Sequence, residues 1–425
     1  MNVGDRLTLH IEKPAAGGRM IGRHEGAVVL VLRAIPGEDV EVEIEKVQRG
    51  TAWARTVHVL QPSPDRVVHD DDWACGGNVY SHVRYARQLD LKRDIIRDAF
   101  ARIGRMAPPD DIPIAASAVD GYRMRARFRY SDGRLGYFRE GTHQLCDPAP
   151  TRQLLPSTIG AVSDLAAALN QTATRSVHEV ELSENCAATQ RAVHLILHDD
   201  GDPSRLGRLP RVAGMDGMSY GVAGGRPIAL AGDATVADTL PVTPAREAST
   251  VSLRRHAHAF FQGNRFLLST LVADVGEVVP PAAVLDLYAG VGLFAVTLAA
   301  RGNTQVVAIE GDRVCAHDLK SNAAQCEGRV DARHQSVEAF LASARQRAFD
   351  TLIVDPPRTG MTREALAGAI ALRAPRVVYV SCDVATLGRD ARMLVDAGYR
   401  LVSVRAFDLF PNTAHVESLA VFDRI

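Results

Sequence analysis

The stretch "AVLDLYAGVGLFAVTLAARG", residues 283–302, decides the fold of the C-terminal part of the chain. It begins as a buried strand, passes through Gly290 and Gly292, and continues with the apolar pattern of a helix. Glycines at such a turn let a ligand approach the backbone, because no side chain stands in the way. We therefore predict a strand, a tight turn and a helix, with a ligand site at the turn.

More strands follow, and most of them are again followed by helical sequence. The expected strands lie in "QVVAIEG" (305–311), "RVDARHQSV" (329–337), "FDTLIVDPP" (349–357) and "RVVYVSC" (376–382). Strands that alternate with helices predict a doubly wound parallel sheet. In such sheets, ligands bind outside the carboxyl ends of the strands. We expect the functional residues at that edge.

The rest of the chain has a different pattern, and we expect three domains. Residues 1–62 contain short strands separated by turn signals, which predicts a small OB-type β-barrel. Residues 75–250 combine helical periodicity over 82–105 with a hairpin in "YRMRARFRYSDGRLGYFRE" (122–140), which predicts a central α+β domain. The third domain, with the alternating pattern, covers residues 255–425.

The composition is that of an ordinary globular protein. The 425 residues are 46% hydrophobic and 23% charged, with a formal net charge of −1. We find no apolar run that could span a membrane and no signal-like N-terminus, so we expect a cytoplasmic protein. The six cysteines are scattered without a CxxC pair, which argues against a disulfide framework. Any contact with nucleic acid must come from local basic patches.

Acidic residues stand at the ends of the first two strands of the predicted sheet. Glu310 lies 24 positions after Asp286, close to the ~20-residue interval at which an acid meets ribose hydroxyls. This pairing fits either a dinucleotide or S-adenosylmethionine, and the glycine pattern does not distinguish between these two cofactors.

Asp355 begins the segment "DPPRTGM", residues 355–361. Two prolines fix the chain directly after a buried strand, so Asp355 projects rigidly from the edge of the sheet. Enzymes that methylate bases need a fixed polar group there, whereas a dehydrogenase does not. A helix-capping role for Asp355 is the simpler alternative. An amino-group methylase could also use such a loop, although Arg358 replaces its usual aromatic residue.

Cys382 stands where the strand "RVVYVSC" gives way to a helix. A free cysteine is often a small buried hydrophobe. As a nucleophile, its thiolate would add to C6 of uracil and so activate C5 toward an electrophilic methyl group. A base must then remove the C5 proton, and Glu417 in "NTAHVESLAVF" (412–422) is the candidate; a solvated surface acid is the alternative for Glu417. The helix N-terminus is expected to lower the pKa of the thiol.

Together these stretches resemble the RNA uracil-5 methyltransferase family, S-adenosylmethionine-dependent enzymes that form 5-methyluridine in tRNA and ribosomal RNA. The resemblance covers almost the whole chain, and its motifs are "FFQGN" (260–264), "LDLYAGVG" (285–292), "VVAIEG" (306–311), "DPPRTG" (355–360), "VYVSCDVATLGRD" (378–390) and "HVESLAVF" (415–422). It implies an α/β fold, in which a Rossmann-like class I methyltransferase domain follows an N-terminal TRAM-like OB barrel and a central α+β domain.

The resemblance also implies roles for individual residues. Cys382 would be the nucleophile and Glu417 the base. The residues lining the methyl-donor site would be Gln262, Tyr288, Glu310 and Asp355. Many family members have Asn after the second loop glycine, where this chain has Leu293, so one contact near the methionine part of the donor would be missing.

The chain departs from the family at a second place. Many members bind a 4Fe–4S cluster through CxxxxxCxxC and a distant Cys, but "HDDDWACGGN" (69–78) keeps only Cys75. His69 and Asn78 stand at the neighbouring ligand positions. Because thiolates are the normal ligands of such clusters, and Cys146 alone cannot replace the missing ones, we expect no iron–sulfur cluster and no metal site.

The most basic region lies between residues 84 and 139, with thirteen Lys or Arg against seven Asp or Glu. Within it, the alternating side chains of one strand face are Arg123, Arg125, Arg127 and Arg129. Like charges without interleaved acids repel one another unless an anion is present, so this face predicts phosphate contact; a solvated face is the alternative. The target uridine must leave its stack to reach Cys382.

The function expected from these features is methyl transfer from S-adenosylmethionine to C5 of uridine in RNA, through a covalent Cys–C6 adduct. A TRAM-like domain favours 23S rRNA over tRNA as the substrate. The alternatives are a tRNA uracil-5 methyltransferase and a non-catalytic RNA-binding protein with a degenerate methylase domain. We expect a monomer that binds RNA and no membrane.

Overall fold

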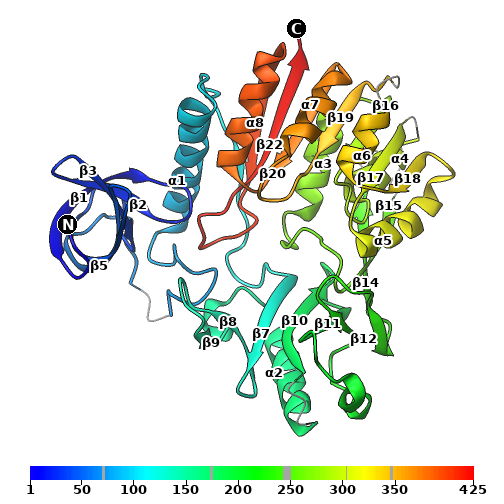
Figure 1. The fold of residues 1–425 in the computed structure, drawn as a ribbon, viewed down its shortest axis with the longest axis horizontal. Helices are drawn as coiled ribbons and strands as arrows, with labels where there is room; N and C mark the ends of the chain where they lie inside the picture. The colour runs from blue at the N-terminus through cyan, green and yellow to red at the C-terminus, as the bar shows by residue number, and fades with distance from the viewer. Residues whose placement is uncertain (69–71, 173–175, 243–249, 303, 345–347) are drawn as a thin grey trace.

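The computed structural model describes residues 1–68, 72–172, 176–242, 250–302, 304–344 and 348–425. In these residues the chain forms a closed barrel, a seven-stranded sheet, a two-stranded ribbon and an eight-stranded sheet (Figure 1). No helix of this described part is long and apolar enough to cross a membrane.

The N-terminal barrel closes in the strand order β1-β2-β3-β5-β4. Its strands are β1 (Arg6–Pro14), β2 (Met20–His24), β3 (Ala27–Leu32), β4 (Asp39–Gln48) and β5 (Thr51–Gln61). In β4 the buried residues Val40, Val42 and Ile44 alternate with outward-facing acids, as expected for a strand with one face in a core. The predicted OB-type barrel is confirmed.

The seven-stranded sheet occupies the middle of the chain. Its strands are β7 (Arg125–Ser131), β8 (Arg134–Phe138), β9 (Leu145–Cys146), β10 (Val177–Glu184), β11 (Arg191–Leu197), β12 (Gly217–Val222) and β13 (Ile228–Gly232). The predicted hairpin is β7–β8, which turns between Ser131 and Arg134. Helix α2 (Pro156–Gln171) packs its buried side chains, Leu165 and Leu169 among them, into the core of this sheet. The ribbon β14 (Thr235–Pro241) and β15 (Thr250–His256) leads on to the last sheet.

The C-terminal sheet has the strand order β18-β17-β16-β19-β20-β22-β21-β6. Its strands are β16 (Ala283–Leu287), β17 (Gln305–Glu310), β18 (Val330–His334), β19 (Thr351–Val354), β20 (Arg376–Ser381), β21 (Tyr399–Phe407), β22 (Glu417–Arg424) and the short β6 (Ile114–Ala115). The strands from β18 to β20 run parallel, and β22 returns antiparallel to β20. The strand order changes direction at β16, between β17 and β19, and such a switch point is where doubly wound sheets bind ligands.

Helices cover both faces of this sheet. One face packs against α3 (Leu268–Val278), α4 (Leu293–Ala299) and α5 (Arg313–Ala323). The other packs against α6 (Val337–Ser343), α7 (Arg363–Ala371) and α8 (Val384–Asp396). The Rossmann-like α/β fold expected from the alternating sequence is confirmed.

The predicted helix over 82–105 is present as α1 (Tyr85–Asp98), extended by the π-helical turn η1 (Ala99–Ile103). It packs on the C-terminal sheet rather than on the middle one: Ile96 and Phe100 join the core cluster that contains α8. Gly388 in α8 permits the close approach, because a Cβ there would lie 2.9 Å from the carbonyl oxygen of Ala99. The three-domain division stays a prediction, with this segment in contact with the last domain.

A fully buried ion pair joins α1 to the segment between β21 and β22. The ammonium of Lys92 donates to the carboxylate of Asp408, and both side chains are completely inaccessible to solvent. Lys92 Nζ also donates to the carbonyl oxygen of Phe410 at 3.1 Å. The pair thus anchors the connection that leads to Glu417.

We predict that Lys92→Met lowers the free energy of unfolding by about 3–5 kcal/mol, because it leaves the Asp408 carboxylate buried without a partner. Urea denaturation followed by circular dichroism measures this. The control is Arg392→Met, which breaks the solvent-exposed pair of Arg392 with Asp396 and should leave the midpoint close to that of the wild type. Equal midpoints for the two variants would contradict the anchoring role.

Candidate active site

The carboxyl ends of the parallel strands bring several functional groups to one edge of the sheet. Asp286 lies in β16, Glu310 ends β17, and Asp355 and Cys382 directly follow β19 and β20. Because β22 runs the other way, its first residue, Glu417, starts at the same edge. The pairing of Ser381 with Ser418 puts the backbone of Glu417 opposite that of Cys382, so the two predicted catalytic residues are neighbours.

The glycine turn after β16 is open on the side of this edge. Gly290 and Gly292 both have positive φ, 56° and 96°. A Cβ on Gly290 would meet nothing within 4 Å, whereas one on Gly292 would come within 2.9 Å of Leu319 and Val296. Gly292 is therefore needed for helix packing, and Gly290 leaves space above the turn for a ligand.

Glu310 holds this turn in place. Its Oε2 accepts a hydrogen bond of 2.7 Å from the Gly290 amide, and its Oε1 accepts one of 2.6 Å from the Asp312 amide. Burial raises the pKa of Glu310, and the two amides partly oppose this shift. Each carboxyl oxygen keeps a second lone pair, so the group can still accept from a ligand hydroxyl.

Tyr288 has a positive φ of 63°, which a residue with a side chain rarely adopts. Its half-buried ring packs against the core cluster on the α6–α8 face. The charges that act on its hydroxyl are those of Glu338 and Asp390, not those of the other predicted site residues. Strained backbone of this kind is typical of functional turns.

Gln262 and Asp355 are in contact, as expected for two residues of one site. The Gln262 Nε2 donates to Asp355 Oδ2 at 3.4 Å. Burial raises the pKa of Asp355 to about 7, the hydrogen bond from Gln262 lowers it, and the charge of Glu310 raises it again. Below them Asp286 is fully buried, and burial followed by the charge of Asp355 raises its pKa well above the usual range.

Cys382 is a free cysteine and is partly exposed. The expected lowering of its pKa is wrong. Burial, then the charges of Glu417 and Asp355, raise the pKa of the thiol to about 12, and only Arg358 acts in the other direction. The Asp383 carboxylate caps the helix N-terminus, accepting from the amides of Ala385 and Thr386, and its charge also raises the pKa of the thiol.

Glu417 is buried, with 2% of its surface exposed, and its Oε1 has no hydrogen-bond partner among the described residues. Burial, then the charge of Asp355, raise its pKa well above the usual range, while Arg358 lowers it. Arg358 thus acts on both Cys382 and Glu417. It is the functional residue that the sequence reasoning missed: its place in "DPPR" was visible, but its effect on Glu417 depends on a strand some 60 residues later.

The carboxyl groups at this edge suit a cationic ligand. Asp286, Glu310, Asp355 and Glu417 all have raised pKa values, because burial is not matched by nearby cations. S-Adenosylmethionine carries a sulfonium and an ammonium group, and its ribose has hydroxyls. The open space above Gly290 and the orphaned Glu417 oxygen therefore fit such a ligand.

Leu293, the residue after the second glycine of the turn, begins α4 and is buried in the core. Its apolar side chain offers no hydrogen bond to a ligand.

The arginine row on the middle sheet is not unpaired as expected. Strand β10 lies beside β7 and supplies the acids: Arg127 pairs with Glu179 at 2.9 Å and with Glu181, and Arg129 pairs with Glu179. The argument that repulsion within the row requires a phosphate is therefore wrong, since the two cross-strand acids already pair with Arg125, Arg127 and Arg129.

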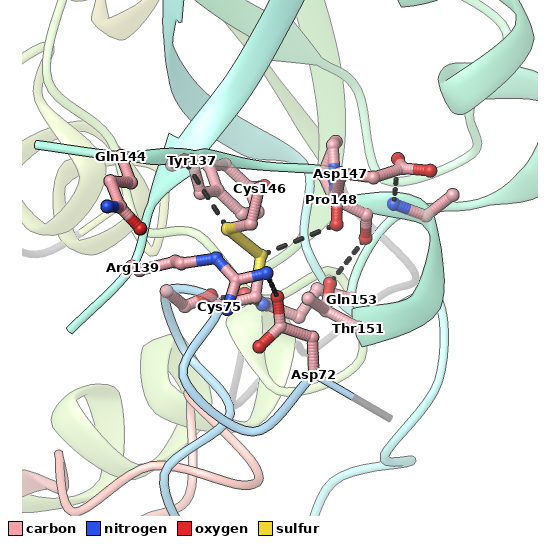
Figure 2. Close-up of a disulfide and its surroundings, with 12 residues drawn as sticks. Asp72, Cys75, Tyr137, Arg139, Gln144, Cys146, Asp147, Pro148, Thr151 and Gln153 are labelled. Carbon is pink, nitrogen blue, oxygen red and sulfur yellow. Dashed lines mark hydrogen bonds and ion pairs between the residues drawn. A yellow bond between two sulfur atoms is a disulfide. The ribbon is translucent and has the colours of Figure 1, made fainter. Parts of the chain in front are cut away.

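A disulfide joins Cys75 to Cys146, which contradicts the expectation drawn from the scattered cysteines. Figure 2 shows it linking the segment around Asp72 and Cys75 to β9, with an ion pair of 2.8 Å between Arg139 and Asp72 beside it. Sequence spacing could not reveal the pair, because its partners are 71 positions apart.

The ligand set expected for an iron–sulfur cluster is incomplete here. A cluster normally takes four thiolates, and the two cysteines present at this place are bonded to each other. Asn78 is buried and His69 lies outside the described residues. Within the described ranges, no three His, Cys, Asp or Glu side chains are grouped to hold a metal. That no cluster binds stays a prediction.

Three family models match the chain. The TRAM domain matches residues 1–57, the methyltransferase small domain residues 257–378, and tRNA (uracil-5-)-methyltransferase residues 341–425. The tRNA (uracil-54, C5)-methyltransferase of Pyrococcus abyssi, solved with S-adenosyl-L-homocysteine, has a similar fold: its TM-score is 0.74 at 22% identity, over 98% of this chain and 100% of that one.

Two similar proteins are named 23S rRNA (uracil(1939)-C(5))-methyltransferase RlmD. The one from Methylococcus capsulatus is 32% identical over 98% of this chain and 97% of its own length. The one from Halomonas elongata is 31% identical over 98% of this chain and 89% of its own. An uncharacterized RNA methyltransferase of Streptomyces coelicolor is 30% identical over 99% of this chain and 93% of its own. Identity of this extent, over nearly the full length of both chains, shows that the protein belongs to the RNA uracil-5 methyltransferase family.

Proposed function

We propose that this protein methylates C5 of a uridine in 23S rRNA through a covalent bond between Cys382 and C6 of the base. The observation that carries the proposal is the antiparallel pairing of β20 with β22, in which a partly exposed cysteine and a buried carboxyl begin at the same edge of the sheet. A nucleophile and a base on opposite sides of one pyrimidine are what this reaction needs.

The methyl donor would be held at the switch point between β16 and β19. Glu310 accepts from its ribose hydroxyls, and Tyr288 and Gly290 form the turn around it. Gln262 and Asp355 line the side nearest to Cys382. When bound, S-adenosylmethionine supplies an electrophilic methyl group. Asp355 and Glu417 supply the negative charge that attracts its cationic groups.

In the reaction, the Cys382 thiolate forms a bond from Sγ to C6, and the electron pair of the C5–C6 double bond moves toward O4 as an enolate. C5 then uses this electron density to form a bond to the methyl carbon; the bond from that carbon to the sulfonium sulfur breaks, and the donor leaves as S-adenosylhomocysteine. The Glu417 carboxylate removes the C5 proton, the double bond re-forms, and the thiolate leaves. No net oxidation or reduction occurs, and the enzyme regains its thiolate.

The raised pKa of Cys382 means that this thiolate is scarce in the ligand-free protein. Arg358 is the protein cation that favours it, and the same guanidinium favours the ionised form of Glu417. The positive charge of the bound donor, next to Asp355, would act in the same direction. We therefore propose that substrate binding ionises the site.

For the RNA, we propose that the domains at residues 1–62 and 75–250 hold the strand while the domain at 255–425 carries out the chemistry. The choice of 23S rRNA is supported by the names of the Methylococcus and Halomonas relatives and by the TRAM match. The tRNA alternative is supported by the solved structure from Pyrococcus abyssi, at lower identity.

Mapping of 5-methyluridine in cellular RNA tests the substrate. In cells without this protein, one or more 5-methyluridines should disappear from 23S rRNA, and they should return with the wild-type chain but not with Cys382→Ala. Loss from tRNA alone would favour the tRNA alternative. An unchanged map of both RNAs would favour a non-catalytic RNA-binding protein.

RNA that contains 5-fluorouridine tests the covalent step. Because fluorine at C5 cannot be removed as a proton, the adduct should persist and migrate as a protein–RNA complex on a denaturing gel. The control is Cys186→Ser, which changes another partly exposed free cysteine and should leave the adduct intact. An adduct that survives Cys382→Ala would exclude Cys382 as the nucleophile.

The role of Arg358 predicts a pH dependence. The neutral forms of Cys382 and Glu417 are inactive and their pKa values are raised, so kcat should increase with pH. Arg358→Met removes the charge that lowers both pKa values and should move the rising limb to higher pH, so that the variant needs a higher pH than the wild type to reach the same kcat. If the pH dependence of kcat were the same in Arg358→Met as in the wild type, Arg358 would have no electrostatic role in catalysis.

A further inference from the structure

A cavity lies beside the proposed catalytic groups. It is a cavity of about 280 Å³ between the middle sheet, the glycines after Cys75 and the segment before β22. Its lining residues are Gly76, Gly77, Arg123, Arg127, Arg129, Tyr137, Phe138, Arg358, Phe410, Thr413 and His415. We call it the arginine pocket. Neither Cys382 nor Glu417 is part of this lining, although His415 is two residues from Glu417 and Arg358 acts on both.

Two of the four arginines in the pocket are available to an anion. Arg127 and Arg129 are paired with Glu179 and Glu181, as described above. Arg123 and Arg358 have no carboxylate partner within ion-pair distance in the described ranges of the chain. Arg123 is nevertheless held firmly: its Nε donates to the carbonyl oxygen of Arg125 at 2.9 Å and its NH1 to Gln153 Oε1 at 2.6 Å. Its remaining N–H groups are free to bind a phosphate.

Aromatic rings stand next to these cations. The Arg123 guanidinium lies 5.6 Å from the ring centre of Tyr137 and 5.9 Å from that of Phe410. Tyr137 is buried and stacked on Phe128, so its ring supports the pocket from below. Phe410 is only partly buried and can offer ring surface to a base. Free cations together with an accessible aromatic ring are the features that bind single-stranded nucleic acid.

The disulfide supports the floor of this pocket. Gln153, which orients Arg123, donates from Nε2 to the carbonyl oxygen of Gly76 at 2.9 Å. Gly77 has a φ of 84°, which favours glycine, and a Cβ there would displace the side-chain amide of Gln153, 2.7 Å away. Both glycines directly follow Cys75, whose bond to Cys146 ties them to the strand that pairs with Tyr137 (Figure 2).

We propose that the arginine pocket binds one nucleotide of the substrate RNA other than the target uridine, with its phosphate on Arg123 and Arg358 and its base against Phe410. The Cys75–Cys146 disulfide positions the floor of the pocket. This inference rests on the proposed function, because it takes RNA as the ligand. A neighbouring nucleotide held here would be unstacked from the target, which lowers the cost of turning the uridine toward Cys382.

Binding of a fluorescent U12 oligoribonucleotide, followed by anisotropy at several salt concentrations, tests the pocket without any catalysis. Arg123→Met should weaken binding and reduce the slope of log Kd against log salt by about 0.7, the value for one phosphate contact on a single strand. Phe410→Leu should weaken binding about fivefold or more without changing the slope, because it removes stacking and no charge.

The matched control is Arg226→Met. Arg226 is an exposed arginine in a different cavity, between β13 and α5, and it too has no carboxylate partner in the described residues. This variant should bind the oligonucleotide like the wild type. Wild-type affinity and salt slope for Arg123→Met, or equal losses for Arg123→Met and Arg226→Met, would overturn the proposal.

The positioning role of the disulfide needs its own readout. The double variant Cys75→Ser/Cys146→Ser should raise KM for RNA severalfold, with kcat and the affinity for S-adenosylmethionine within about twofold of wild type. Dithiothreitol, which reduces the bond to two thiols while forming its own cyclic disulfide, should raise KM of the wild type to the same value and leave the variant unchanged. A loss in kcat and in donor affinity together would indicate a general structural role and contradict the assignment.

The two proposals fail in different ways. The first test is a methyl-transfer assay with RNA from cells that lack the protein. If the wild type transfers no methyl group to this RNA, the proposed function is wrong. The anisotropy measurements still decide whether the arginine pocket binds RNA. If Cys382→Ala abolishes transfer as expected but Arg123→Met and Phe410→Leu retain wild-type KM and oligonucleotide affinity, the function stands and the arginine pocket is refuted.

Discussion

Parallel pairing in the C-terminal sheet is the constraint on which the rest of the site depends. Because β16, β17, β19 and β20 point the same way, the groups that follow them converge on one edge, and antiparallel β22 adds Glu417 from the opposite direction. None of these residues is near another in sequence. The sheet is held by two apolar cores, one on each face, and its connection to β22 is anchored by the buried pair of Lys92 and Asp408.

The same convergence creates an electrostatic problem. Four carboxyl groups and a thiol lie at one edge of the sheet, and Arg358 is the cation that lowers the pKa values of both Cys382 and Glu417. In the absence of ligands the site therefore favours neutral acids and a protonated thiol. A cationic methyl donor suits such a site, because its positive charge would lower the pKa values that burial has raised. This coupling would keep the cysteine unreactive until both substrates are present.

The middle sheet shows how a charge pattern depends on its neighbours. Arg127 and Arg129 form ion pairs with acids of β10, which lies about 50 residues later in the chain. These two arginines are therefore neutralised by neighbouring carboxylates and are not an unpaired surface for phosphate. The uncompensated cations are Arg123, just before the strand, and Arg358, from another sheet. They meet in a pocket whose lining includes the two glycines that follow the disulfide-bonded Cys75.

Local patterns were enough to predict the elements. The alternation of strands and helices, the glycine turn after "AVLDLY", the hairpin around residues 131–134 and the barrel in the first 62 residues are each encoded by neighbours in the chain, because hydrophobic period and turn chemistry act over a few residues. The motifs around Cys382, Asp355 and Glu417 could be recognised because each is a continuous stretch of sequence. The family could be predicted from these motifs.

What needed the tertiary structure was every property set by residues distant in sequence. The direction of the Cys382 pKa depends on desolvation and on Glu417, Asp355 and the capping of its helix by Asp383. The docking of α1 on α8, the partners of the arginines and the bond between Cys75 and Cys146 depend likewise on which surfaces fold together. Burial and Coulomb interaction act through space, and a sequence records spacing along the chain but not distance across the fold.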